Sequence, residues 1–294
     1  MTKVRRNIPN PPGRAMTAVP TVELNNGVLI PQLGFGVFQV PPPETQHVVE
    51  QALEIGYRHI DTAEMYGNEA GVGAAVRASG LPRSDVFVTS KLNNGYHHRD
   101  DALRAFDTTM AELGLDYLDL FLIHWPLPGH DNYVEAWRTL EGIYADGRVR
   151  AIGVSNFHVA HLDRLAAECD VVPAANQIES HPYLQQDALH TADAERGIAT
   201  EAWSPIARGR CLNDPVLLGI AAEHDVTTAQ VALRWAIQRG DIVFPKSMDP
   251  TRMATNFDLF SFELTADDMA AIATLDRGER TGPNPDEFDW IPGS

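Results

Sequence analysis

The sequence contains little cysteine and no long apolar run. Its 294 residues include two cysteines, Cys169 and Cys211, with no Cys-x-x-Cys pair and no histidines at ligand-like spacing. A disulfide framework is therefore excluded, a structural zinc or other metal site has no support, and a reducing cytoplasm fits best. No apolar stretch approaches the roughly 18–20 residues that span a bilayer, so no membrane segment is expected.

Basic residues are also scarce. Lys and Arg number 23 against 40 Asp and Glu, which gives a formal net charge of −17. Like-charge repulsion disfavours a general nucleic-acid surface or an anionic-membrane surface. An anionic ligand would therefore need a local cluster of basic residues in this otherwise acidic protein. The remaining composition, 44% hydrophobic and 21% charged, is ordinary for a soluble globular protein.

Short apolar runs alternate with one-sided helical patterns from residue 33 onward. Alternating units of this kind predict a parallel sheet, and eight of them favour a closed (β/α)8 barrel, the TIM-barrel fold. The predicted strands cover residues 33–37, 58–61, 85–91, 118–124, 150–155, 174–178, 198–203 and 241–246. The predicted helices cover residues 44–56, 71–80, 99–114, 133–147, 159–168, 215–225, 227–240 and 264–276.

The flanking segments complete the expected organisation. TVELNNGVLIP, residues 21–31, has two strand-like runs around Asn-Asn-Gly, and we expect this hairpin to cap the N-terminal mouth of the barrel. Thr265 is a plausible N-cap for the extra C-terminal helix, which an irregular loop follows. No linker interrupts the units, so we expect one domain over residues 21–294 after a disordered extension over residues 1–20.

Polar side chains stand where several predicted strands end. Asp61 ends the second strand and Tyr66 follows it five residues later, while Lys91 and His124 end the third and fourth strands. All strand C-termini of such a barrel open on one face, where catalytic groups assemble. We therefore expect these four side chains to share one mouth.

This combination of residue types suits carbonyl reduction. A free tyrosine has a pKa of about 10, poor for proton exchange at neutrality, and the Lys91 ammonium should lower the pKa of Tyr66. Asp61 would keep Lys91 charged, and His124 would donate a hydrogen bond to a carbonyl oxygen. Taken singly, each residue has a structural explanation, such as a helix N-cap or a core histidine. Their expected convergence on one face favours the chemical interpretation.

The chain resembles the aldo-keto reductase superfamily over residues 20–290. GYRHIDTAEMYGNE is similar to the family's GxRHIDTAxxYxNE stretch, and VTSKL, LFLIHWP, IGVSNF, NQIESHPY, AWSP and FPKS follow in the family's order. The resemblance implies a (β/α)8 barrel, NADPH-dependent reduction of aldehydes and ketones, and a catalytic tetrad of Asp61, Tyr66, Lys91 and His124. It also implies a monomer. The subgroup that the chain looks most like is the bacterial 2,5-diketo-D-gluconic acid reductases, although methylglyoxal and simple aldehydes also remain open as substrates.

The resemblance further implies cofactor and substrate contacts. LGFGVFQV begins like a dinucleotide-binding fingerprint but has Gln39 at the third glycine position, so a Rossmann interpretation fails. Gly36 and Val37 would instead line the pocket near the nicotinamide, on which the Trp203 indole could stack. The other implied contacts are Ser155, Asn156, Gln177, Ser204 and Pro205 for the cofactor and Phe38 and Trp125 for the substrate, with Phe288, Trp290 and Ile291 as C-terminal candidates.

FPKSMDPTRMATN, residues 244–256, indicates which cofactor is used. Lys246, Ser247 and Arg252 form a basic and hydroxyl cluster, and such groups bind a 2′-phosphate. The matching positions of the family bind that phosphate, which favours NADPH over NADH. Asn256 matches the family's adenine-binding asparagine, but Thr255 stands where the family commonly has Glu.

Two alternatives remain open. In a class I aldolase, Lys91 would form a Schiff base inside a similar barrel, although the adjacent Asp61 favours the charged amine. In a cofactor-binding sensor or subunit, the same fold would bind NADPH without turnover. The intact tetrad favours the reductase over this second alternative.

Overall fold

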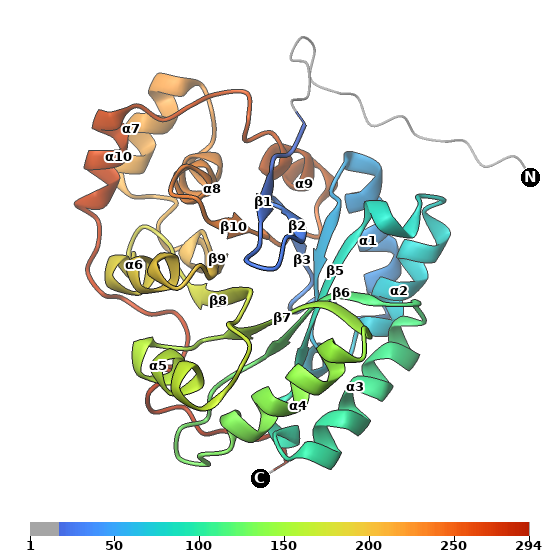
Figure 1. Ribbon diagram of the computed structural model, residues 1–294. Coiled ribbons are helices and arrows are strands. Elements are labelled where there is room, and N and C mark those ends of the chain that lie inside the picture. The colour runs from blue at the N-terminus through green and yellow to red at the C-terminus, as the bar shows by residue number, and fades with distance from the viewer. Residues whose placement is uncertain (1–17, 294) are drawn as a thin grey trace, which may run out of the picture.

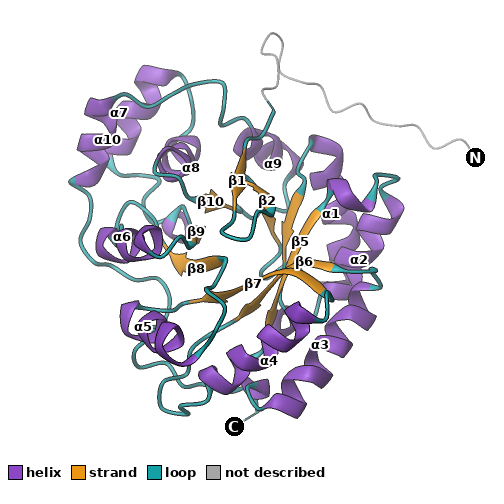
Figure 2. Cartoon of the chain, in the orientation of Figure 1, coloured by secondary structure: helices purple, strands orange, loops and turns teal. Residues whose placement is uncertain are grey.

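Eight parallel strands form the centre of the protein. The structure is a computed structural model that describes residues 18–293. Its main sheet has the order β10-β9-β8-β7-β6-β5-β4-β3, and a parallel bridge from Leu33 to Val243 connects the two end strands. Helices surround these strands (Figure 1, Figure 2). The predicted (β/α)8 barrel is confirmed.

Every predicted barrel strand is present. The apolar runs form strands because helices cover one face and the barrel interior covers the other. Strands β5 and β6, for example, are buried along their whole length. The barrel strands are β3 (Phe35–Gly36), β4 (His59–Asp61), β5 (Phe87–Leu92), β6 (Leu118–Ile123), β7 (Val149–Ser155), β8 (Ala175–Glu179), β9 (Ala199–Trp203) and β10 (Ile242–Val243).

Ten α-helices accompany the strands within residues 18–293. Eight coincide with predicted helices, and Thr265 caps the last of them, its Oγ1 accepting a hydrogen bond of 3.1 Å from the Asp268 amide. Two helices, α6 and α9, were not predicted. The helices are α1 (Pro42–Ile55), α2 (Glu69–Ala78), α3 (Arg99–Leu113), α4 (Tyr133–Ala145), α5 (Val159–Glu168), α6 (Asp187–Glu195), α7 (Pro215–His224), α8 (Thr228–Gln238), α9 (Pro250–Phe257) and α10 (Ala266–Ala273).

The N-terminal hairpin closes one end of the barrel, as predicted. Strands β1 (Thr21–Glu23) and β2 (Leu29–Pro31) pair in antiparallel fashion. Leu24 and Ile30 pack in one apolar cluster with Phe87, the first residue of β5, and with residues from other barrel strands. Figure 1 shows the hairpin lying across the ring of strands. Functional groups must therefore gather at the opposite mouth.

The sequence also led to predictions about an N-terminal extension, membrane segments and metal sites. The extension expected over residues 1–20 falls mainly on residues 1–17, which lie outside the described residues. Across residues 18–293, no helix is long and apolar enough to cross a membrane. Over the same range, no group of three or more His, Cys, Asp or Glu is arranged to hold a metal ion.

Candidate active site

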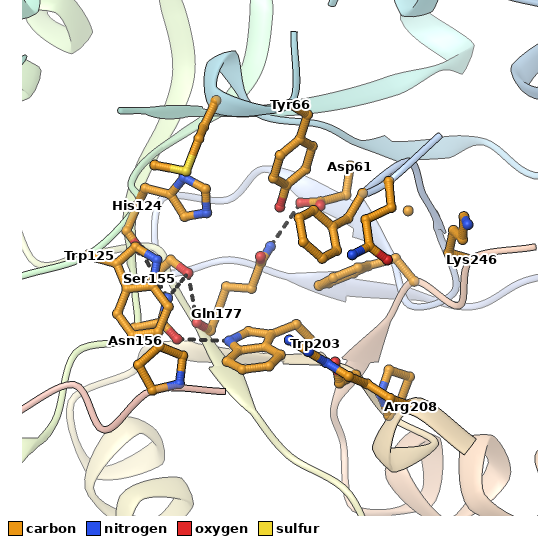
Figure 3. A pocket seen from close by; sticks show the side chains of 18 of the residues that line it. Asp61, Tyr66, His124, Trp125, Ser155, Asn156, Gln177, Trp203, Arg208 and Lys246 are labelled. Carbon is orange, nitrogen blue, oxygen red and sulfur yellow. Dashed lines mark hydrogen bonds between the residues drawn. The ribbon is translucent and has the colours of Figure 1, made fainter. Parts of the chain in front are cut away.

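A cavity of about 460 Å³ opens at the C-terminal ends of the barrel strands (Figure 3). The strand ends and the loops that follow them supply its walls, as expected for a barrel of this type. Thirteen of the residues predicted from sequence line it: Gly36, Phe38, Asp61, Tyr66, His124, Trp125, Ser155, Asn156, Gln177, Trp203, Ser204, Pro205 and Lys246.

Five predicted site residues do not line this cavity. Lys91 lies beneath it and is fully buried, and Val37 is buried behind the wall. Ser247 precedes helix α9, and Arg252 and Asn256 belong to that helix. These last three residues follow Lys246 in the chain and lie outside the lining of the cavity.

Other lining residues were missed or only partly anticipated. Phe288 lines the cavity, whereas Trp290 from the same segment is 51% exposed and does not. Arg208 was missed, although the loop after Trp203 had to lie at this mouth and its charge was visible in the sequence. The other missed residues are Gln39, Met65, Ile206, Phe244 and Pro283.

The structure brings the four tetrad residues together. Lys91 Nζ donates to both carboxylate oxygens of Asp61 at 2.8 Å and to the carbonyl oxygen of Thr62 at 2.9 Å. The ammonium nitrogen lies 5.2 Å from the centre of the Tyr66 ring. The ring centres of Tyr66 and His124 are 5.8 Å apart. Strand register explains the ion pair, because Thr89 pairs with Asp61 and Lys91, two residues on, points to the same face.

Burial determines the protonation state of the two groups that face the cavity. It raises the pKa of Tyr66 above its ordinary value; the Lys91 ammonium lowers that pKa, as expected from the sequence, but does not offset burial. Burial, followed by Lys91, lowers the pKa of His124 well below its ordinary value. At neutral pH the site therefore presents a protonated phenol and a neutral imidazole.

Lys91 itself stays charged. Burial alone would lower its pKa, but Asp61 and Tyr66 act in the opposite direction and the pKa is raised overall. A lysine that forms a Schiff base must lose its proton. The aldolase alternative therefore does not fit this site.

Several residues at the floor of the cavity are bonded to one another. Asn156 Nδ2 donates to Ser155 Oγ at 3.0 Å and to the His124 carbonyl at 2.9 Å, and Asn156 Oδ1 accepts from Trp203 Nε1 at 2.8 Å. Ser155 Oγ donates to the backbone carbonyl of Gln177 at 2.9 Å. Asn156 has a φ of 65°, in the left-handed region that asparagine tolerates, and this turn directs its side chain into the network.

Three basic side chains differ from the others in their lack of partners. Within residues 18–293, Arg208, Lys246 and Arg252 have no ion-pair or side-chain hydrogen-bond partner, while every other Lys and Arg there has one. Lys246 and Arg208 lie on the side of the cavity away from His124 and Trp125 (Figure 3). In a chain of net charge −17, the unpaired Lys246 and Arg208 at one end of the cavity suit a ligand that carries phosphates.

Comparison with known proteins places this geometry in a family. The model of the aldo/keto reductase family matches residues 32–277. An aldo-keto reductase of Mycolicibacterium smegmatis is 50% identical over 271 residues, which cover 92% of this chain and 98% of that protein. Methylglyoxal reductase DkgA of Yersinia pestis is 46% identical over 275 residues, covering 93% and 99%.

A solved structure agrees with these relatives. A mutant of Gox0644 in complex with NADPH has a TM-score of 0.90 and 43% identity, and the match covers 93% of this chain and 100% of that one. The chain belongs to the aldo/keto reductase family and is an oxidoreductase.

Proposed function

We propose that this protein uses NADPH to reduce small, uncharged carbonyl compounds to alcohols, with Tyr66 as the proton donor. One observation carries the proposal: a protonated phenol and a neutral imidazole face one cavity above a buried Lys91–Asp61 ion pair. A hydrogen-bond donor and a proton donor are the groups that carbonyl reduction requires from the protein.

NADPH fits the cation distribution. Its phosphates would bind where Arg208, Lys246 and Arg252 are unpaired, with Ser247 beside them, because guanidinium and ammonium groups bind phosphate well. The Gox0644 complex with NADPH supports this assignment. The nicotinamide would lie against Trp203, near the other predicted contacts Gly36, Val37, Ser155, Asn156, Gln177, Ser204 and Pro205, and the adenine near Asn256.

Thr255 makes the adenine end of this site differ from the family pattern. Its hydroxyl donates to the Thr251 carbonyl at 2.9 Å, so that hydrogen is committed to the backbone of α9. A threonine also lacks the carboxylate of the family's glutamate. Affinity for NADPH therefore rests mainly on the phosphate end of the site.

The protein's own groups then perform the proton chemistry. His124 Nδ1 is buried without a partner, so Nε2 is the nitrogen available to donate a hydrogen bond to the carbonyl oxygen. Tyr66 gives its hydroxyl proton to that oxygen as negative charge develops there. Lys91 stabilises the resulting phenolate, and Asp61 holds Lys91 in its charged form. NADPH, held by the residues named above, would supply the hydride for the carbonyl carbon.

The substrate end of the cavity is aromatic. Trp125 packs on Phe288 with ring centres 4.4 Å apart, and Phe38 lies 5.1 Å from the Tyr66 ring. The unpaired cations that line the cavity, Arg208 and Lys246, lie at the other end, where the cofactor phosphates would bind. Methylglyoxal and aromatic aldehydes therefore suit this end better than sugar-derived keto acids such as 2,5-diketo-D-gluconate, whose carboxylate would find no cation. The relative named methylglyoxal reductase supports this preference for methylglyoxal over sugar-derived keto acids.

The cellular setting belongs to the same proposal. We place the protein in the cytoplasm as a monomer. Cys169 and Cys211 are both free thiols in the structure, which agrees with a reducing compartment.

The test is the variant Tyr66→Phe, which removes the transferable proton and keeps the ring. We expect the kcat for methylglyoxal to fall about a thousandfold, since positioned acid catalysis contributes roughly 10²–10⁴. NADPH affinity, measured by quenching of tryptophan fluorescence, should stay near that of the wild type.

Tyr117→Phe is the matched control, because Tyr117 lies just before β6, at the opposite end of the barrel. It should keep normal turnover. Near-normal turnover by Tyr66→Phe would refute the proton-donor assignment. Tight NADPH binding by the wild type without turnover of any carbonyl compound would instead support the cofactor-binding sensor.

A further inference from the structure

Glu201 is a buried carboxyl group in the barrel interior to which neither the sequence nor the mechanism above gives a role. It lies in β9, and its exposed fraction is 0%. In the parallel pairing of β8 with β9, Gln177 is its direct register partner. Both side chains point inward, and Gln177 Nε2 donates to Glu201 Oε2 at 2.9 Å.

The same amide nitrogen has a second carboxylate partner. Gln177 Nε2 also donates to Asp61 Oδ2 at 2.8 Å (Figure 3). A primary amide has two N–H donors, and here both are used by acceptors on one side. With Asp61 alone, the second N–H would lack a partner and the amide plane could turn about the remaining bond. Two acceptors fix both the plane and the direction of the amide.

The carbonyl oxygen of this amide is consequently turned away from the carboxylates. Gln177 lines the cavity, and no described residue donates a hydrogen bond to its Oε1. The neighbouring Ser155 hydroxyl and Asn156 amide are already bonded within the protein. Gln177 Oε1 is therefore a fixed acceptor without a protein partner at the floor of the cavity.

We propose that Glu201 is a positioning residue that holds Gln177 Oε1 toward the cavity as the acceptor for the N–H donor of the nicotinamide carboxamide. The proposal rests on NADPH binding in the orientation given above. It assigns Glu201 to recognition of one group of the cofactor rather than to proton transfer.

The electrostatics of Glu201 are compatible with this role. Burial, and next the charge of Asp61, raise the pKa of Glu201 to about 7. In either protonation state one carboxyl oxygen can accept from Gln177. Glu201→Gln offers the same acceptor, whereas Glu201→Leu has a similar size and offers none.

The experiment compares two ligands that differ only at the carboxamide. NADP⁺ carries an NH₂ group there, and its 3-acetylpyridine analogue carries a methyl group that cannot donate. The readout is the ratio of their dissociation constants, measured by tryptophan fluorescence quenching. We expect the wild type to prefer NADP⁺ and Glu201→Leu to reduce that preference about fivefold or more, the size of one lost hydrogen bond. Glu201→Gln should retain it.

Two further variants and a melting curve complete the design. Gln177→Leu should reduce the preference as much as Glu201→Leu does, and the double variant should show no further loss, because both act on one hydrogen bond. A general disturbance of the barrel would weaken both ligands equally, would appear in the melting temperature and would leave the ratio unchanged.

The outcomes separate this inference from the proposed function. An unchanged ratio in Glu201→Leu, with cofactor binding and turnover intact, would overturn the positioning role alone. Loss of the preference in Glu201→Gln as well would also overturn it. Failure of the wild type to bind NADPH would reject both the inference and the proposed function.

Discussion

At the scale of single residues, Lys91 illustrates how a charge is accommodated without solvent. Its side chain is fully buried, and its three N–H donors have three acceptors, the two oxygens of Asp61 and the Thr62 carbonyl. Removing one partner of a buried pair leaves the other charge uncompensated, which is strongly destabilising. Asp61 therefore fixes the Lys91 ammonium beneath Tyr66, and the position of that ammonium depends on both strands that carry the pair.

Arg252 is the residue whose loss should change cofactor preference. We expect Arg252→Ala to weaken NADPH binding by about tenfold or more, since a guanidinium bound to phosphate contributes charge-assisted hydrogen bonds. NADH lacks the 2′-phosphate, so its binding should change little. Dissociation constants for both cofactors, from fluorescence quenching, measure the difference.

Arg104→Ala provides the control, because Arg104 is an exposed arginine on α3 that pairs with Asp101. It should alter neither affinity. If Arg252→Ala weakens NADPH and NADH by the same factor, the phosphate assignment fails.

The sequence could locate the tetrad but not the residues that support it. Asp61, Lys91 and His124 were identifiable because polar residues at strand ends must meet at one mouth of a barrel. Glu201 was not, because a glutamate in the run IATEAW looks like a solvent-facing position of an alternating strand. In the structure the inner face of β9 is buried, and the pairing of β8 with β9 brings Glu201 to Gln177.

At the scale of secondary structure, apolar periodicity predicted most elements but missed the two short helices α6 and α9. Helix α9 has eight residues, and Met253 and Phe257 are its buried apolar side chains. Helix α6 buries Leu189 and Ala192 but also Asp193, which accepts hydrogen bonds from neighbouring polar groups. Tertiary hydrogen bonds of this kind leave no periodic signal in the sequence.

The segment after α10 is held over the cavity at two places. Glu179, at the end of β8, accepts hydrogen bonds from the amides of Thr281 at 2.6 Å and Gly282 at 3.1 Å. Further along, Asp289 Oδ1 accepts from the Gly129 amide at 2.8 Å. These contacts fix the position of Phe288 against Trp125 at the substrate end.

This segment should therefore affect which substrates are used. We expect Phe288→Ala to lower kcat/KM for benzaldehyde about tenfold, because an aromatic substrate loses an apolar contact in the cavity. The value for methylglyoxal, a much smaller compound, should change by less than about threefold. Steady-state kinetics with both substrates at saturating NADPH provide the measurement.

Trp290→Ala is the comparison variant from the same segment, since Trp290 is 51% exposed and lies outside the cavity lining. It should leave both values near those of the wild type. Equal losses for benzaldehyde and methylglyoxal in Phe288→Ala would show that the segment acts on the catalytic geometry instead.

At the scale of the whole molecule, the closed barrel buries several histidines in neutral form. Burial lowers the pKa of His59 to about 3, of His97 to about 4 and of His190 to about 3. Burial also raises the pKa of Glu69 and Asp241 to about 7. The histidines and the carboxyl groups give opposite slopes to stability as a function of pH.

Whether stability rises or falls with pH depends on whether the folded or the unfolded state binds more protons. A histidine with a depressed folded pKa contributes stability above its unfolded pKa of about 6.5, and that contribution is lost as pH falls toward the folded value. A carboxyl group with a raised folded pKa contributes stability below its unfolded pKa of about 4, and loses it as pH rises through about 7. The slopes oppose one another between about pH 4 and 6.5, and below this range the histidines dominate and favour unfolding.

His59 allows this account to be tested. It is fully buried, with its Nε2 3.1 Å from Thr89 Oγ1, and His59→Gln removes the titrating ring. As pH falls from 6 to 4, the free energy of unfolding of the wild type should decrease relative to that of the variant by about 1.4 kcal/mol per pH unit. Urea unfolding at several pH values gives both quantities, and taking the difference cancels the carboxyl contributions. His47→Gln, at an exposed position of α1, should show no such trend; if the two variants behave alike, burial of neutral histidine is not the cause of acid unfolding.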